Sequence, residues 1–304
     1  VDIAASYPYA REVSGLATGP CEALFVADTA HDRVIFIDGL CGSQAWLPPA
    51  VSAWTDAPGH FRAPRGLALG ADVLHVADSG NARLQSLARP GLEAADAWTG
   101  LGRPTSLAID AVGRLLVVDA QAKRVHRVLA NGAADAAFDA TLAAQGRLLE
   151  PLFVAVGAED AVWVSDAQAN AVFRFDASGA FVSTLAGPAG WLPGALACRG
   201  ERLYVANASD GRIHVFDGSV VSGQVRGWRG PVTALAVAAD GTFFIKPGLD
   251  AAWFRFEADA AFATAGELTA GPFDAGVESR WGRAWIEAGS PPGGAVARHV
   301  VLQD

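Results

Sequence analysis

One short pattern recurs six times along the chain and limits the folds open to it. It is an apolar run of about five residues that ends in Asp or Asn in five copies and in Lys in the sixth. The last residues of the copies are Asp28, Asp78, Asp119, Asp166, Asn207 and Lys246. Successive copies are 39 to 50 residues apart. A repeat of this length is typical of architectures in which each copy forms one supersecondary unit.

Each copy has a further apolar run on either side. A small-residue motif precedes it, as in Gly15-Leu16-Ala17, and a third run such as Arg33–Ile37 follows it. The runs are short, are rich in β-branched and aromatic residues, and are separated by Gly-bearing turns, which favours strands. No segment shows a sustained helical period. A weaker fourth strand is expected between copies, at Val51–Trp54, Ala95–Trp98 and Phe181–Leu185.

Four short strands in every 40–45 residues or so are typical of a propeller blade. We predict an all-β fold, a six-bladed β-propeller of four-stranded antiparallel blades, over residues 1–267. Ile3–Tyr7 is expected to supply the outer strand of the last blade. Residues 268–304 are expected to form a short hairpin-like β extension, because Arg280–Ala288 and Ala295–Leu302 flank a centre rich in Gly and Pro.

The charge balance argues against nucleic acid and anionic membranes as partners. The chain has 23 Lys and Arg against 32 Asp and Glu, a net charge of −9, and its Arg residues form no run. Binding to phosphates needs clustered cations, because counterion release supplies most of the affinity. Apolar residues also never run for the roughly 18 positions that a membrane helix needs. We therefore expect no nucleic-acid partner and no insertion into a membrane.

The order Pro-x-Gly-Leu-Ala, then Leu-x-Val-Ala-Asp, then Arg five residues after the Asp resembles the NHL repeat. The second copy matches best, with Pro64–Ala68 followed by Val76–Arg83. This resemblance implies a six-bladed propeller and says little about activity. An Asp that ends a strand can bind nearby backbone N–H groups, and an Arg can pair with it. We interpret the recurring residues as structural: Asp28, Asp78, Asp119, Asp166, Asn207, Arg33, Arg83, Arg124 and Arg212.

The sequence predicts no catalytic residues, no cofactor and no metal site. Related six-bladed enzymes carry His, Asp, Glu or Asn on their inner strands, often around calcium or zinc, whereas none of the inner strands expected here holds His or Glu. The histidines do not converge, and His126 and His214 fall at third-strand positions. We therefore expect that the chain is not an enzyme. The alternative is a propeller lyase or hydrolase with a divergent metal site.

The three cysteines give no metal-binding pattern. Cys21, Cys41 and Cys198 form neither a CxxC motif nor a cluster with His. Isolated buried thiols are the simpler interpretation. A disulfide between Cys21 and Cys41 stays open, because the sequence alone does not give their separation in space.

The loops that follow the Asp row are expected to emerge together on one face of the ring. They are small, polar and nearly neutral, which suits a protein or a glycan better than RNA. The residues on these loops that we predict to meet a partner are His31, Asp32, Asn81, Lys123, Asn170 and Asp210.

The segment after the repeats has a resemblance of its own. The order Phe273-Asp274-Ala275-Gly276, Trp281-x-Arg283 and Pro291-Pro292-Gly293 is similar to segments that follow NHL propellers in bacterial proteins of phage tails and contractile injection particles. The resemblance implies a protein-interaction or structural module with particle subunits as partners. A glycan-binding propeller is the alternative. The lack of Met and the start at Val1 predict a piece of a longer protein, and with no leader visible we expect a cytoplasmic or particle-associated location.

Overall fold

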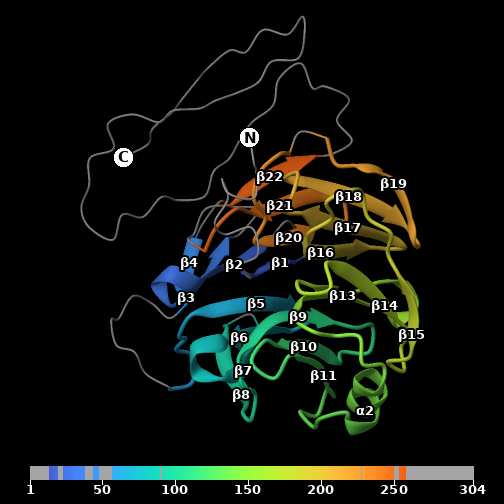
Figure 1. The fold of residues 1–304 in the computed structure, drawn as a ribbon. Coiled ribbons are helices and arrows are strands. Elements are labelled where there is room, and N and C mark those ends of the chain that lie inside the picture. Colours follow the sequence, from blue (N-terminus) through green and yellow to red (C-terminus); the bar gives the residue numbers. More distant parts are fainter. Residues whose placement is uncertain are drawn as a thin grey trace, which may run out of the picture. The chain divides into compact units, whose positions relative to one another are not determined.

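The computed structural model describes residues 14–19, 23–37, 44–47, 57–89, 91–226, 228–249 and 253–257. All of them lie within the first of two units into which the chain divides, Val1–Pro272 and Phe273–Asp304. The strands of this unit form six antiparallel sheets that follow one another along the chain (Figure 1). The predicted C-terminal extension and the predicted boundary at residue 267 lie outside the described residues and stay predictions.

Within each sheet, strands that are consecutive in the chain are neighbours. The first two sheets contain β1 (Leu16–Thr18), β2 (Leu24–Asp28), β3 (Arg33–Ile37) and β4 (Gln44–Leu47), then β5 (Pro64–Leu69), β6 (Val73–Asp78), β7 (Arg83–Ala88) and β8 (Glu93–Trp98). The next two contain β9 (Pro104–Ile109), β10 (Leu115–Asp119) and β11 (Arg124–Val128), then β12 (Pro151–Val156), β13 (Val162–Asp166), β14 (Ala171–Phe175) and β15 (Phe181–Thr184). The last two contain β16 (Pro193–Arg199), β17 (Arg202–Asn207), β18 (Arg212–Asp217) and β19 (Val220–Gln224), then β20 (Ala234–Val237), β21 (Thr242–Lys246) and β22 (Phe254–Glu257).

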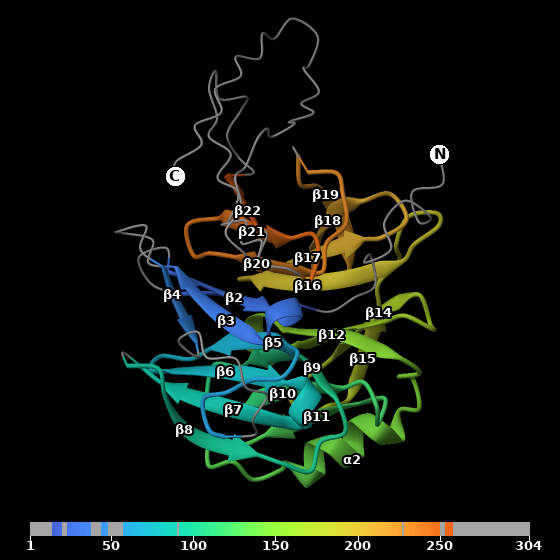
Figure 2. The ribbon, with the colours of Figure 1, turned by 90° about the vertical axis from the view of Figure 1, so that its left-hand side faces the viewer.

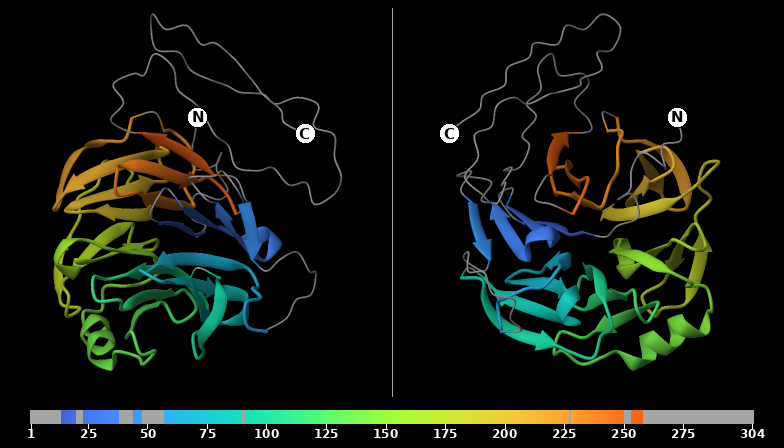
Figure 3. Two further views of the ribbon diagram at one scale, coloured as in Figure 1. Left: turned by 180° about the vertical axis from the view of Figure 1, so that it is seen from behind. Right: turned by 60° about the vertical axis from the view of Figure 1, so that its left-hand side comes forward.

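The first strands of the six sheets contact one another in a closed cycle, β1–β5–β9–β12–β16–β20 and back to β1. The first and last blades are joined directly, because the Ser14 N–H donates to the Thr233 carbonyl at 2.9 Å. The sheets stand around this cycle as blades (Figure 3). The prediction of an all-β, six-bladed propeller is therefore confirmed. Ile3–Tyr7, expected to complete the last blade, lies outside the described residues.

The apolar core lies between neighbouring blades. The alternating residues of each second strand point to the two faces of its sheet, so one strand serves two interfaces. In the fifth and sixth blades, for example, Tyr204 of β17 meets Phe243 of β21 edge to face, with ring centroids 5.0 Å apart. Leu203 and Ile245 are fully buried in the same cluster. The repeat period thus places one apolar layer between each pair of sheets.

The third blade departs from the repeat. Its sheet has three strands, and the following segment forms helix α2 (Ala136–Ala144), which lies outside β11 (Figure 2). The prediction of four strands in every blade and of no helix is wrong at this place. The Asp135 carboxylate caps the helix by accepting from the Phe138 N–H at 3.2 Å. Phe138 and Leu142, four residues apart on one face, are both buried. Among the described residues no helix is long and apolar enough to cross a membrane.

The other outer strands agree with the sequence in part. The runs predicted at Ala95–Trp98 and Phe181–Leu185 lie in β8 and β15. The fourth strand of the first blade is β4 at Gln44–Leu47, paired with β3, whereas the run predicted for it at Val51–Trp54 lies outside the described residues.

Candidate functional site

The predicted partner-face residues of the first two blades, His31, Asp32 and Asn81, make hydrogen bonds within the propeller. His31 Nδ1 lies 2.8 Å from Asp28 Oδ1, and the Asn81 amide donates to Asp78 Oδ2 at 2.9 Å. The Asp32 carboxylate accepts a backbone N–H of the next blade at 2.6 Å. These side chains shape the loops that carry them, and their binding to a partner stays a prediction.

The other three lie in the corresponding loops of the third, fourth and fifth blades. Lys123 and Asn170 immediately precede the third strands, with left-handed φ values of 55° and 49°. Asp210 Oδ2 lies 3.0 Å from Nε2 of the buried His214. The six residues therefore occupy five different blades, and the structure does not bring them together into one site.

The Asp row joins each blade to the loops beside it. The buried Asp166 is the clearest case. Its carboxylate accepts the backbone N–H groups of Leu149 and Glu150, which precede the inner strand, at 2.7 and 2.8 Å. It also accepts those of Gln168 and Ala169, which follow the second strand, at 3.1 and 2.8 Å. Asp119 makes the same set of four contacts. Burial opposes the charge on Asp119, and the four backbone donors nevertheless lower the pKa of its carboxyl below the ordinary value.

The Arg of the repeat does not have one constant role. Arg33 and Arg83 pair with the buried Asp of their own blades, Asp28 and Asp78, each at 2.7 Å. In the fifth blade, by contrast, the Arg212 guanidinium donates to Gln224 at 2.8 Å.

The sixth copy replaces the carboxylate by a cation. Lys246 is fully buried, and its ammonium group donates to the Gly248 carbonyl at 2.7 Å. Thr233, which precedes the inner strand, donates its hydroxyl to the same carbonyl at the same distance. The two loops are thus held together through a shared backbone acceptor, whereas the third and fourth blades use the shared carboxylates of Asp119 and Asp166.

The centre of the ring contains a small cavity of about 180 Å³, lined by inner strands of several blades. Most of the residues that line it have apolar side chains, with Leu67, Leu107 and Cys198 among them. Burial raises the pKa of the Cys198 thiol to about 12, so the thiolate nucleophile is scarce at neutral pH. Within the described residues there is no group of three or more His, Cys, Asp or Glu placed to hold a metal ion.

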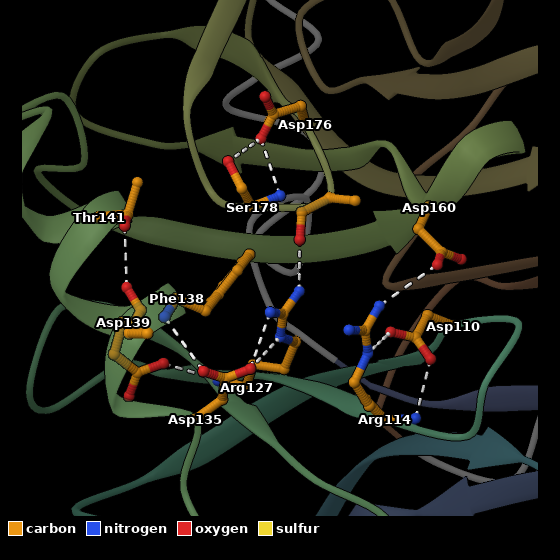
Figure 4. Close-up of polar contacts among 12 residues, drawn as sticks. Asp110, Arg114, Arg127, Asp135, Phe138, Asp139, Thr141, Asp160, Asp176 and Ser178 are labelled. Atoms are coloured by element: carbon orange, nitrogen blue, oxygen red, sulfur yellow. Dashed lines mark hydrogen bonds and ion pairs between the residues drawn. The ribbon is translucent and has the colours of Figure 1, made fainter.

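The third blade, in which α2 replaces the fourth strand, contains the candidate site. Arg127 of β11 fixes the start of the helix, because its guanidinium donates twice to Asp135, at 2.7 and 3.0 Å (Figure 4). The same guanidinium donates to the Ala177 carbonyl of the fourth blade at 2.6 Å and lies 4.0 Å from the centre of the Phe138 ring. The bond to Arg127 holds the pKa of Asp135 below its ordinary value. The helix is therefore attached to two blades at its N-terminal end.

A second contact crosses the same pair of blades. Arg114 donates to Asp110 at 2.5 Å within the third blade and to Asp160 of the fourth blade at 3.3 Å (Figure 4). Arg114 and Arg127 thus each donate a hydrogen bond from the third blade to the fourth. We infer that the third blade is held firmly beside its neighbour.

A cavity of about 310 Å³ lies between β11 and the C-terminal half of α2. Val125 and Leu142 give it an apolar lining. Three permanent cations surround it: Lys123, Arg124 and Arg147 are all exposed and all line the cavity. The Arg147 guanidinium lies 3.5 Å from the centre of the Phe181 ring of β15, and this cation–π contact restrains it.

His126 and Asp139 form a pair in the wall of this cavity. His126 Nδ1 lies 2.7 Å from Asp139 Oδ2, and the other carboxylate oxygen accepts the Arg127 N–H at 2.9 Å. The hydrogen bond to Asp139 raises the pKa of His126 above the ordinary value of 6.5, and partial burial opposes this rise. The imidazolium therefore persists to higher pH, and it adds to the positive charge of the cavity.

Another His–Asp pair, in the fifth blade, is more deeply buried. In the fifth blade, His214 also lies on a third strand and contacts Asp210, but only 2% of its surface is exposed. The Trp191 ring stands edge-on to the imidazole, with centroids 5.6 Å apart. The pair of the third blade, by contrast, lines the cavity between β11 and α2.

An Asp139→Asn variant is expected to lower the pKa of His126, because the amide can still accept the Arg127 N–H but no longer stabilises an imidazolium. Because the pKa of His126 is higher in the folded chain, its protonation stabilises the fold. This stabilisation is complete at pH values below the ordinary pKa of 6.5, and it is lost as the pH rises through the raised pKa. We therefore expect the variant to lose about 1 kcal/mol at pH 5.5 and less at pH 8.5. NMR titration of the His126 ring protons and urea unfolding at both pH values measure the two effects. An unchanged His126 pKa would contradict the pairing.

Sequence reasoning named Lys123 and Arg124 but missed Asp139 and Arg147. His126 was assigned to a third strand, and that placement is confirmed by β11. Its acidic partner comes from α2, a helix with no counterpart in the described parts of the other copies. One signal in the sequence points to this helix: an Ala-rich stretch that begins with Asp135 as a potential helix cap.

Comparison with known proteins gives no family for this chain. No protein-family model matches it, and no curated protein matches it. Solved structures do resemble it. Virginiamycin B lyase from Staphylococcus aureus aligns with a TM-score of 0.58 at 12% identity, covering 86% of this chain and 84% of the lyase. A catalytically inactive variant of that lyase with quinupristin gives a TM-score of 0.58 at 11% identity, covering 87% and 85%.

A chain from a nidogen–laminin complex aligns with a TM-score of 0.56 at 18% identity, over 71% of this chain and 80% of that one. What the chain shares with these proteins is a fold. The identities are too low to transfer an activity, a ligand or a site residue from any of them.

These likenesses correct one expectation. The sequence predicted that the chain is not an enzyme, but a lyase has the same propeller architecture. The prediction is therefore wrong as an inference from the fold, since this fold supports catalysis as well as binding. The suggested link to phage tails and injection particles receives no support from the comparisons, and the segment that suggested it lies outside the described residues.

Proposed function

We propose that this chain is a protein-binding propeller whose third blade supplies the binding site. The observation that carries the proposal is the cavity of about 310 Å³ between β11 and α2, where a helix replaces the fourth strand of the repeat. Residues that recur in most blades stabilise the propeller itself. The helix and the charged cavity of the third blade are not part of the repeat, so we assign them to binding. Proteins usually bind small molecules in concave sites with an apolar lining and a few convergent polar groups. A side chain of a partner protein can fill such a cavity in the same way.

The rigid surroundings support this proposal. Binding costs less when the site is formed in advance, because fewer side chains lose freedom. Here Arg127 attaches the helix to two blades, and Phe181 restrains Arg147. A propeller of similar fold occurs in a structure of a nidogen–laminin complex, so the fold is compatible with a protein partner.

Selection from a displayed library of random twelve-residue peptides tests the proposal. Ala140 is exposed and lines the cavity, so Ala140→Trp fills it, whereas Ala137→Trp adds the same ring to an exposed position of α2 outside the cavity. We expect enriched peptides to bind the native chain and Ala137→Trp alike, and to bind Ala140→Trp at least about tenfold more weakly. The proposal fails if no peptide is enriched, or if the enriched peptides bind both variants equally.

The resemblance of the C-terminal segment would place such binding in a phage-tail-like or injection particle, with its subunits as partners. Neighbouring genes for sheath and baseplate proteins would support this setting. The glycan alternative concerns the loops after the Asp row, and a glycan array that stays blank would remove it.

A further inference from the structure

We propose that the cavity of the third blade binds a phosphorylated side chain of the partner protein, with Lys123, Arg124 and Arg147 around its phosphate group. This inference rests on the proposed function and specifies the chemistry that the partner presents. Three features of the described residues carry it: cations without acidic partners, an open approach to these cations, and an excess of positive charge that matches a dianion.

The three permanent cations of the cavity have no acidic partner. Among the described residues, the side chains of Lys123, Arg124 and Arg147 make no ion pair and no hydrogen bond. The repeat arginines Arg33 and Arg83, by contrast, donate to buried carboxylates of their own blades. The donor groups of the three cations are therefore available to a ligand.

The C-terminal end of α2 does not account for these cations. A helix C-terminus attracts cations, because its last carbonyls lack partners within the helix. Here the backbone N–H and the side-chain amide of Gln145 donate to the Leu142 and Thr141 carbonyls, at 3.2 and 3.0 Å. The Gly146 N–H donates to the Ala143 carbonyl at 3.1 Å. These carbonyls are thus satisfied by the chain that follows the helix and not by the cations.

A ligand can reach the cations from solvent. All three are exposed, and so are Ala140 and Ala143 of α2, which also line the cavity. Val125 and Leu142 line it too, but both are buried. Binding therefore depends on the exposed groups and requires no contact with the covered backbone of β11.

The charge of the cavity matches a phosphomonoester. The three cations line it together with a single carboxylate, that of Asp139, which His126 and Arg127 already engage. This excess of positive charge stands out in a chain whose net charge is −9. A phosphomonoester carries about 1.5 to 2 negative charges at neutral pH and has three acceptor oxygens, whereas an Asp or Glu side chain carries one charge. A phosphate group therefore neutralises the excess, and a carboxylate neutralises only part of it.

His126 offers a further donor to the phosphate. Its Nδ1 contacts Asp139, and its Nε2 has no hydrogen-bond partner in the described part of the chain. The bond to Asp139 is the main cause that raises the pKa of His126, and the charge of Asp119 also raises it. Partial burial and the positive charge of Arg124 oppose the rise, so Arg124 lies close enough to act on the imidazole. A bound dianion is expected to raise this pKa further, because it stabilises the imidazolium.

Fluorescence anisotropy with synthetic peptides tests the inference. The probe is a labelled, acetylated heptapeptide with phosphoserine at its centre, leucine on either side of it and alanine elsewhere. The leucines can pack on the exposed Ala140 and Ala143. Matched peptides with serine or glutamate at the centre serve as controls. We expect the serine peptide to bind at least about tenfold more weakly and the glutamate peptide to fall between the two, because the phosphate makes the most charge-assisted contacts.

Protein variants locate the binding. Arg124→Glu combined with Arg147→Glu reverses two exposed charges and is expected to weaken binding of the phosphoserine peptide at least about tenfold. Arg226→Glu changes an exposed arginine beyond β19 of the fifth blade and is expected to leave the affinity unchanged. Circular dichroism confirms that each variant is folded. NMR titration gives a second readout, since saturating phosphoserine peptide is expected to raise the pKa of His126 and the serine peptide to leave it unchanged.

The results separate this inference from the proposed function. Equal binding of the phosphoserine and serine peptides would refute the inference, and so would equal binding to the native chain and the double variant. If inorganic phosphate competes as strongly as the unlabelled phosphoserine peptide, the site recognises a free anion and the assignment to a partner side chain falls. Library peptides that require the cavity, when phosphoserine adds no affinity, would leave the proposed function standing without this inference. If the phosphoserine peptide and the library peptides all bind Ala140→Trp as tightly as the native chain, both fall.

Discussion

An Asp166→Ala variant is expected to lose about 3–5 kcal/mol of the free energy of unfolding. The wild-type carboxylate is fully buried and accepts four backbone N–H groups from two separate loops. Alanine leaves these donors without their acceptor, and a buried donor without a partner costs more than the net value of the bond it made. Urea unfolding followed by tryptophan fluorescence measures the loss.

Asp176→Ala provides the matched control. Asp176 also accepts backbone N–H groups, from Ser178 and Ala180, but it lies in an exposed turn where water can replace it. Its removal is expected to cost about 1 kcal/mol or less. Asp166→Asn keeps one acceptor oxygen and should fall between wild type and Asp166→Ala. A loss at Asp166 no greater than that at Asp176 would show that the Asp row does not hold the loops together.

A Gly66→Ala variant is expected to lose about 3 kcal/mol, for a steric reason. A Cβ at this position would lie 2.7 Å from the backbone nitrogen of Leu107 and 2.8 Å from the carbonyl oxygen of Thr105. Both atoms belong to the neighbouring inner strand β9, and backbone in a packed sheet cannot move aside as a flexible side chain can. The two inner strands would have to separate, and the apolar layer between their blades would open with them.

Gly223→Ala in β19 is the matched control, because a Cβ there meets no atom within 4 Å. We expect its free energy of unfolding to stay within about 0.5 kcal/mol of wild type. Thermal unfolding of the two variants side by side gives the comparison. If Gly66→Ala unfolds at the wild-type temperature, the inner strands are less closely packed than the structure shows.

The fold could be predicted because its determinants are local and repeated. Each second strand ends at its Asp, Asn or Lys, and a small inner motif precedes it, so the order of strands follows from the order of motifs. Helix α2 left a much weaker signal. Only Phe138 and Leu142 of its nine residues are buried, and the rest of its sequence is mostly alanine, so no apolar period stands out.

The candidate site was harder to predict for a different reason. His126 lies on a repeated strand and Asp139 on an inserted helix, and their contact depends on how that helix packs. The bond from Arg127 to Asp135 sets that packing, and no repeat pattern encodes it. The sequence alone therefore placed the histidine on its strand but gave no partner for it. Arg147 was missed for the same reason, since its position depends on Phe181 of the next blade.

The closed cycle of inner strands also has a consequence for synthesis on the ribosome. Strands within a blade are near in sequence and can pair as soon as they emerge. The bond from Ser14 to Thr233, by contrast, joins the two ends of the repeat array. During translation the first blade must wait with one flank uncovered until the sixth has been made. Ring closure is therefore a late event, and the exposed flank is where a nascent chain of this kind would most need protection from aggregation.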